Sequence, residues 1–125
     1  MAKTSQEVAL KRVYETPSAG DGIRVLVERL WPRGLSKERA HVDVWLKEIA
    51  PSAELRKWYS HDPAKFDEFR RRYEAELASE PAHAALLELR ELVARDHATL
   101  VFATHDAELS NAAVLRDLLR DTTNA

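Results

Sequence analysis

Cysteine is absent from this sequence of 125 residues. A chain without thiols can form no disulfide, thiolate nucleophile or cysteine-ligated metal centre, and such a composition suits a reducing compartment. Glycine and proline are scarce, at 3 and 5 residues, which excludes collagen-like and low-complexity chains. No apolar run approaches the length of a membrane span, and the polar segment 1–7 lacks the apolar stretch of a secretory signal. We therefore expect a cytoplasmic protein with no membrane partner.

Neither sign of charge dominates, since 19 Lys and Arg residues stand against 21 Asp and Glu residues. The formal net charge of -2 gives no general attraction to nucleic acid or anionic lipid, so polyanion binding would need a local basic patch. The length and the hydrophobic content of 45% are enough for a buried core. We expect one domain over residues 1–125, with polar tails at about 1–6 and 121–125.

Apolar runs rich in β-branched residues predict three strands, over residues 8–14, 23–30 and 98–103. Apolar residues at helical spacing behind capping residues predict five helices. The first helix is expected between Ser36 and Pro51, with an apolar stripe formed by Val42, Trp45, Leu46 and Ile49. The other four helices are expected to begin at Ser52, Asp62-Pro63, Pro81 and Ser110. The connection between the first two strands is shorter than a usual parallel crossover, so their relative direction stays open. The predicted fold class is α/β: a single layered domain with a small parallel or mixed sheet of about three strands and about five flanking helices.

The segment 24–34 is the most informative, because an apolar strand there ends abruptly in charged residues, a tryptophan, a proline and a glycine. In α/β domains ligands bind where the carboxyl ends of strands meet the following loops. The long helical segment between the second and last strands allows these two strands to lie side by side and parallel. Their ends would then bring together Glu28, Arg29 and Arg33 with Thr104, His105 and Asp106.

Arg29 and Arg33 are the candidates for holding an anion. A guanidinium offers planar donors to phosphate or carboxylate, and the start of the helix after Ser36 adds backbone donors. The structural alternative is that one arginine pairs with Glu28 or Asp106 and braces the strand end above Trp31.

Two His-Asp pairs, His61-Asp62 and His105-Asp106, are the candidates for proton transfer. Both acids have a structural alternative as helix caps. Neither pair has the spacing of a helical zinc site, so we expect no metal and no cofactor. The chain also lacks the Gly-x-Ser-x-Gly elbow, the Walker loop and the dinucleotide glycine motif, which disfavours serine hydrolases, nucleoside triphosphatases and Rossmann oxidoreductases.

A nucleic-acid interface is the alternative that Trp31 and the arginine run 70–72 suggest. The run lies among Glu68, Glu74 and Glu76 on one predicted helix, which is typical of a solvated and partly paired helix face. It therefore gives nucleic acid little support.

Several segments together resemble the YeaO-like branch of the prokaryotic domain-of-unknown-function 488 family. The most specific are Trp-Pro-Arg-Gly, Pro-Ser-x-x-Leu-Arg-x-Trp and His-Asp-Pro. The full set comprises Lys11-Arg12-Val13-Tyr14, Asp21-Gly22, Val25 to Lys37, Trp45-Leu46-Lys47-Glu48, Ala50-Pro51-Ser52, Leu55-Arg56-Lys57-Trp58, His61-Asp62-Pro63, Phe69, Tyr73, Leu77 and Asn111. One departure is Glu28-Arg29, where family members usually carry Asp-Arg.

The resemblance covers almost the whole chain and implies an α/β layered fold with a polar pocket, but no particular activity. We thus expect an arginine-containing pocket at the carboxyl edge of the strands that binds an anionic small molecule or nucleotide and can hydrolyse it. The catalytic candidates are Glu28, His61, His105 and Asp106, and the ligand-binding candidates are Arg29, Trp31, Arg33, Thr104 and Asn111. The alternatives are a nucleic-acid-binding or regulatory module, or a structural partner protein without catalysis. The sequence does not indicate an oligomeric state.

Overall fold

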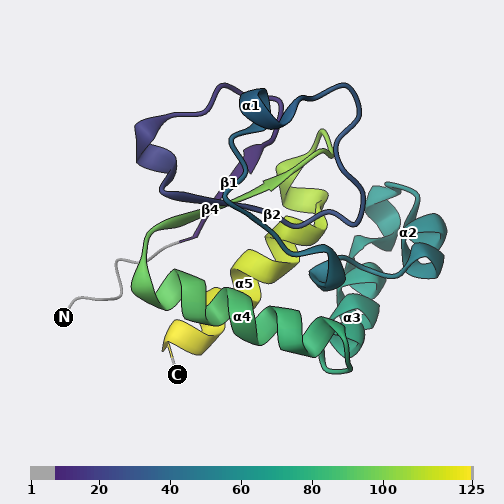
Figure 1. Cartoon of the computed structure of the whole chain (residues 1–125). Helices are drawn as coiled ribbons and strands as arrows, with labels where there is room; N and C mark the ends of the chain where they lie inside the picture. Colours follow the sequence, from purple (N-terminus) through teal and green to yellow (C-terminus); the bar gives the residue numbers. More distant parts are fainter. Residues whose placement is uncertain (1–7, 125) are drawn as a thin grey trace.

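The structure, a computed structural model, describes residues 8–124. Within them, four strands form one parallel sheet in the order β1-β4-β2-β3 (Figure 1). The strands are β1 (Ala9–Arg12), β2 (Ile23–Leu26), β3 (Val44–Trp45) and β4 (Ala98–Phe102). The predicted α/β class with a small parallel sheet is confirmed. The polar tail expected over residues 1–6 and the last residue, 125, lie outside the described residues.

Strand β4 lies between β1 and β2 and runs parallel to both. The first two strands are therefore parallel to each other without being neighbours, which a short connection through the 3-10 turn Ala19–Asp21 permits. The predicted pairing of the second and last strands is confirmed, with Ile23 opposite Ala98 and Leu26 opposite Val101. Because β2 ends at Leu26, residues 27–30 of the predicted strand form the loop that follows it.

The helix predicted between Ser36 and Pro51 was wrong in its main part. A single helical turn, α1 (Lys37–Ala40), follows the Ser36 cap, and His41 ends it with a left-handed φ of 51°. Val44 and Trp45 then form the edge strand β3 beside β2, followed by the 3-10 turn Lys47–Ile49. This segment is extended rather than helical because it pairs with the open edge of β2, whose carbonyls accept hydrogen bonds from the amides of Asp43 and Leu46.

The apolar stripe in this segment has a different origin from that of a helix. Val42 and Trp45 pack on one face of the sheet, whereas Leu46 and Ile49 belong to the core on the other face. The segment contributes apolar side chains first to one face of the sheet and then to the other, and this alternation produces the same spacing as a helix.

The other predicted helices are present: α2 (Ala53–Tyr59), α3 (Phe66–Leu77), α4 (Ala82–Arg95) and α5 (Asn111–Asn124). Ser52 caps α2 by accepting from the amide of Leu55, as the sequence indicates. Asp62 accepts from the amide of Ala64 and so caps the 3-10 turn Pro63–Lys65 that leads into α3, which itself has no side-chain cap. Ser110 accepts likewise from the amide of Ala113. Helix α5 continues to Asn124, so residues 121–124 of the expected C-terminal tail are helical.

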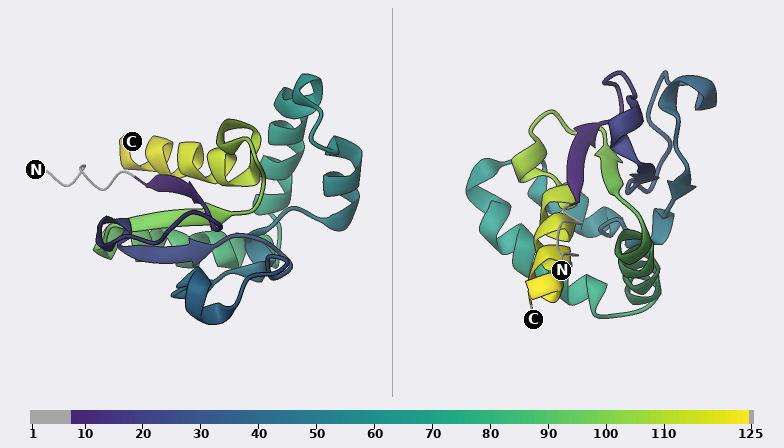
Figure 2. Two further views of the ribbon diagram at one scale, coloured as in Figure 1. Left: turned by 90° about the horizontal axis from the view of Figure 1, so that it is seen from above. Right: turned by 90° about the vertical axis from the view of Figure 1, so that its left-hand side faces the viewer.

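Apolar side chains cover both faces of the sheet. The larger core contains Leu100 and Phe102 of β4 with side chains of α3, α4 and α5. The smaller core contains Val101 of β4 with Leu26 and Ala40, under α1 and its flanking loops. The left-hand view of Figure 2 shows α5 and α1 on opposite sides of the strands. All five residues of β4 are buried, as expected for a central strand.

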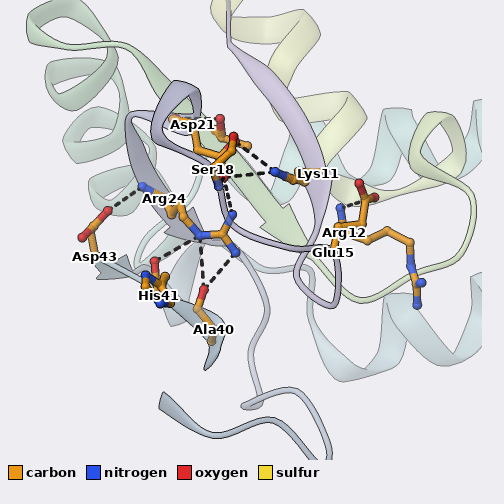
Figure 3. A network of polar contacts seen from close by, with 10 residues as sticks. Lys11, Arg12, Glu15, Ser18, Asp21, Arg24, Ala40, His41 and Asp43 are labelled. Carbon is orange, nitrogen blue, oxygen red and sulfur yellow. Dashed lines mark hydrogen bonds and ion pairs between the residues drawn. The ribbon is translucent and has the colours of Figure 1, made fainter. Parts of the chain in front are cut away.

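A buried ion-pair network anchors the loops of the smaller core to the sheet (Figure 3). The Asp21 carboxylate lies 2.7 Å from Nη1 of Arg24 and 3.1 Å from Nζ of Lys11, and it accepts hydrogen bonds from Ser18. The Arg24 guanidinium also donates to the carbonyl of Ala40, where α1 ends. Burial by itself raises the pKa of Asp21, but its hydrogen bonds outweigh burial and hold the pKa well below the usual value.

Candidate functional site

The carboxyl ends of β2 and β4 meet, as the sequence predicts. Oε2 of Glu28, just beyond β2, accepts a hydrogen bond of 2.9 Å from the backbone N–H of Ala103, just beyond β4. The buried side chain of Asn111, at the start of α5, donates over 3.0 Å to the carbonyl of Val27. These hydrogen bonds connect the loop after β2 with the residue after β4 and with the first turn of α5.

A pocket with a volume of about 480 Å³ lies at this junction. Its polar lining consists of Glu28, Arg56, Lys57, His61, Thr104, His105, Ser110 and Asn111. Its less polar lining consists of Pro51, Tyr59, Phe69, Ala103 and Leu109. Pockets of this size accommodate small molecules and cofactors.

Glu28 is the acid of the pocket. Burial raises the pKa of its carboxyl, whereas the hydrogen bond from Ala103 and the positive charges of Arg56 and His61 act in the opposite direction. The carbonyl of Glu28 accepts a 2.7 Å hydrogen bond from the indole of Trp45, which fixes the backbone as well. The second carboxylate oxygen, Oε1, has no hydrogen-bond partner among residues 8–124.

The two predicted His-Asp pairs divide between the pocket and the caps. His61 and His105 line the pocket, and His61 does so from a left-handed backbone conformation with φ of 58° after α2. Asp62 and Asp106 lie outside the pocket lining, and each caps a 3-10 turn by accepting an amide two residues further on. Both acids therefore act as caps of helical turns, which is the structural alternative that the sequence also allowed.

The residues after Glu28 lead away from the pocket. Arg29 donates over 3.0 Å to the carbonyl of Ala50 and lies 3.6 Å from the Glu48 carboxylate, beside a second hollow of about 390 Å³. Arg33 is exposed, and its carbonyl accepts from the hydroxyl of Tyr14.

Trp31 takes a structural position. Its indole donates to the carbonyl of Leu35, and its ring packs edge-on against Trp45 at 5.4 Å. Of the six residues expected to converge at this sheet edge, Glu28, Thr104 and His105 line the pocket, while Arg29, Arg33 and Asp106 do not. Trp31, a predicted ligand-binding residue, does not line it either.

Arg56 and Lys57 are the charged pocket residues that the sequence interpretation missed as site residues. Their side chains make no hydrogen bond or ion pair with any residue that the structure describes. The available signal was their place in Leu55-Arg56-Lys57-Trp58, between the apolar positions Leu55 and Tyr59 that bury one side of α2. This pattern tells which side of α2 is exposed, but not that α2 lies beside the strand ends.

Unlike Arg56 and Lys57, the three arginines of α3 form ion pairs with acidic side chains. Arg71 and Arg72 both pair with Glu68, and Arg70 pairs with Asp117 of α5 over 2.9 Å. The guanidinium of Arg72 also lies 4.1 Å from the centre of the Trp58 ring. This is the paired, solvated face that the charge pattern indicates.

Two further observations concern ligands and membranes. Within residues 8–124, no group of three or more His, Asp or Glu side chains is arranged to hold a metal ion. Among the helices of the same range, none combines the length and apolar character needed to cross a bilayer.

The chain is similar to proteins from several bacteria. The uncharacterised protein Rv3073c of Mycobacterium tuberculosis is 50% identical over 112 residues, which is 90% of this chain and 92% of the relative. The uncharacterised protein YeaO of Escherichia coli is 38% identical over 113 residues, covering 90% and 96% of the two chains. No solved structure matches the chain. Residues 7–125 match the family model described as the inactive DUF488-N3 subclade. The resemblance inferred from the motifs is thereby confirmed, and the chain belongs to the domain-of-unknown-function 488 family, within its inactive N3 subclade.

Proposed function

We propose that the pocket at the carboxyl ends of β2 and β4 binds a small anionic molecule without converting it. Arg56 and Lys57 hold the anion, and His61 and His105 add hydrogen bonds. The observation that carries the proposal is a pair of exposed cationic side chains, without hydrogen-bond or ion-pair partners among the described residues, in the lining of a ligand-sized pocket.

Three features favour an anion over a neutral ligand. A guanidinium without a protein partner gains most from a bidentate carboxylate or phosphate. The first residues of α5, Ser110 and Asn111, line the same pocket, and the positive end of the helix dipole points toward it. Thr104 adds a hydroxyl from the end of β4.

Binding without turnover is favoured by the description of the subclade as inactive. It also agrees with the positions of Asp62 and Asp106, which serve as caps and leave Glu28 as the carboxyl group of the pocket lining. The alternative, hydrolysis of the bound anion, would need Glu28 or a histidine to activate water.

Thermal denaturation tests the proposal with phosphate, benzoate and a nucleoside monophosphate, each added to the wild type and to Arg56→Gln. A ligand that binds only the folded state raises Tm by an amount that grows with the logarithm of its concentration relative to Kd. We expect at least one of these anions to raise Tm of the wild type and to lose most of the effect in Arg56→Gln. The matched control is Arg39→Gln, since Arg39 is an exposed cation of α1 outside the pocket lining.

The proposal fails if none of the three anions changes Tm, or if Arg56→Gln responds like the wild type. Release of phosphate from the nucleoside monophosphate is measured in the same samples. Release that requires Glu28 would replace the binding proposal by hydrolysis.

A further inference from the structure

We infer that Glu28 determines which anion the pocket accepts: the ligand is an aromatic or heteroaromatic acid that carries an N–H donor at the end opposite its acidic group. This inference rests on the proposed function, because it assumes that the acidic group lies at Arg56 and Lys57. It adds the second half of the ligand and the residue that recognises it.

The first step is the fixed orientation of the Glu28 carboxylate. Oε2 accepts from the amide of Ala103, and the indole of Trp45 holds the Glu28 carbonyl. Oε1 is left without a partner among the described residues, although Glu28 lines the pocket. An ionised carboxylate can only accept hydrogen bonds, so the group that completes this site is a donor.

Acid and cations reach the pocket from different elements of the fold, although Arg56 is near enough to lower the pKa of Glu28. Glu28 comes from the end of β2, whereas Arg56 and Lys57 come from α2. An acidic group placed against Glu28 would be repelled by it and would leave the two cations unpaired. The acidic group therefore lies at α2 and the donor at Glu28.

Apolar and aromatic side chains complete the lining of the pocket. Pro51, Tyr59, Phe69 and Leu109 line the pocket. The rings of Tyr59 and Phe69 are stacked at 4.3 Å with an interplanar angle of 18°, and the Tyr59 hydroxyl donates to the carbonyl of Leu109. A flat, rigid ligand ring fits such a wall and loses little conformational freedom on binding.

Three para-substituted benzoates separate the contribution of Glu28 from that of the cations. The first is 4-aminobenzoate, which presents a donor, the second is 4-acetylbenzoate, which presents an acceptor, and the third is 4-methylbenzoate, which presents neither. Kd values are measured by ligand-observed NMR titration at pH 8, on the alkaline side of ordinary carboxyl titration. We expect 4-aminobenzoate to bind the wild type about tenfold more tightly than the other two, since hydrogen bonds to charged groups are the stronger class.

The variant Glu28→Gln should reverse this order. The amide of Ala103 can donate only to an oxygen, so it holds the glutamine carbonyl and turns the glutamine NH₂ group toward the pocket. The acetyl compound then becomes the preferred ligand. The matched control is Glu54→Gln, which changes an exposed acid of α2 outside the pocket lining and should keep the wild-type order.

The outcomes distinguish the inference from the proposed function. Equal Kd values for the three benzoates, all weakened in Arg56→Gln, would overturn the inference and leave the proposed function standing. Absence of binding by all three at millimolar concentration would overturn the inference, and the anion thermal-denaturation series judges the proposed function separately. The wild-type ranking needs no variant, so a folding defect in Glu28→Gln would not remove the test.

Discussion

The backbone N–H of Ala103 donates to the Glu28 carboxylate over 2.9 Å and thereby joins two residues that are 75 positions apart in the chain. This hydrogen bond crosses from the end of β4 to the loop after β2, and both of its residues line the candidate pocket. The hydrogen bond favours the ionised carboxyl, but burial at this position disfavours it more strongly, because a desolvated carboxylate is less stable than one in water.

Glu28→Gln should therefore stabilise the protein at neutral pH. Burial raises the pKa of Glu28 above its ordinary value of 4.5, so the folded state holds the proton more tightly than the unfolded chain. The stability that this preference contributes is present below pH 4.5 and is lost as pH rises through the folded pKa. Glutamine imitates the protonated form at all pH values. Urea unfolding between pH 4 and 8 should show a gain for the variant that grows with pH, and a difference independent of pH would contradict this explanation.

Asp21→Ala should destabilise the protein by about 3 kcal/mol, because it leaves the buried Arg24 guanidinium without its counter-ion. The pKa of Asp21 lies below the ordinary 3.8, so its contribution is present above pH 3.8 and is lost as pH falls further. The measurement is the free energy of unfolding at pH 7 and at pH 3. The loss caused by the variant should be smaller at pH 3.

Asp43→Ala is the matched control for Asp21→Ala. Asp43 accepts from the backbone amide of Arg24, but it is exposed and does not contact the guanidinium. We expect a cost of about 1 kcal/mol or less. Equal losses in the two variants would show that the buried ion pair is not what stabilises this face.

Gly22→Ala and Gly34→Ala should differ, although both glycines have a positive φ, of 65° and 75°. A Cβ at Gly22 would lie 2.3 Å from the carbonyl oxygen of His97, whereas a Cβ at Gly34 meets no atom within 4 Å. A positive φ alone costs about 1 kcal/mol, and at Gly22 the ψ of -140° and the clash with His97 raise the cost to about 3 kcal/mol. Chemical denaturation of the two variants checks the order, and an equal loss would refute the close approach to His97.

Arg29→Ala and Arg33→Ala should affect stability to different extents while leaving the response to anions unchanged. Arg29 loses a hydrogen bond to the Ala50 carbonyl and a partly exposed ion pair with Glu48, at a cost of about 1 kcal/mol. The exposed Arg33 should change stability by about 0.5 kcal/mol at most. In the thermal assay both variants should respond to anions like the wild type. A lost response in Arg33→Ala would move the anion site to the loop after β2.

The sequence determined the features that depend on neighbouring residues. The caps Ser52, Asp62 and Ser110 bind amides two or three positions ahead, so they mark where helical turns begin whatever the rest of the chain does. The continuous apolar run 98–102 needed cover on both faces, and only a central strand provides that. Segment 42–50 shows the limit of prediction from local spacing. The same spacing of apolar residues arises in an amphipathic helix and in a segment whose side chains pack into two different cores.

Tertiary structure alone decided which charged side chains meet. Glu28 and Arg29 are adjacent in the chain, yet Glu28 lines the pocket and Arg29 donates to the carbonyl of Ala50, because the chain bends at Arg29. Arg56 lies in the same pocket as Glu28 because helix α2 packs beside the carboxyl ends of β2 and β4. Local periodicity carries no information about such long-range packing, which comes from burying the common core of the sheet and its helices.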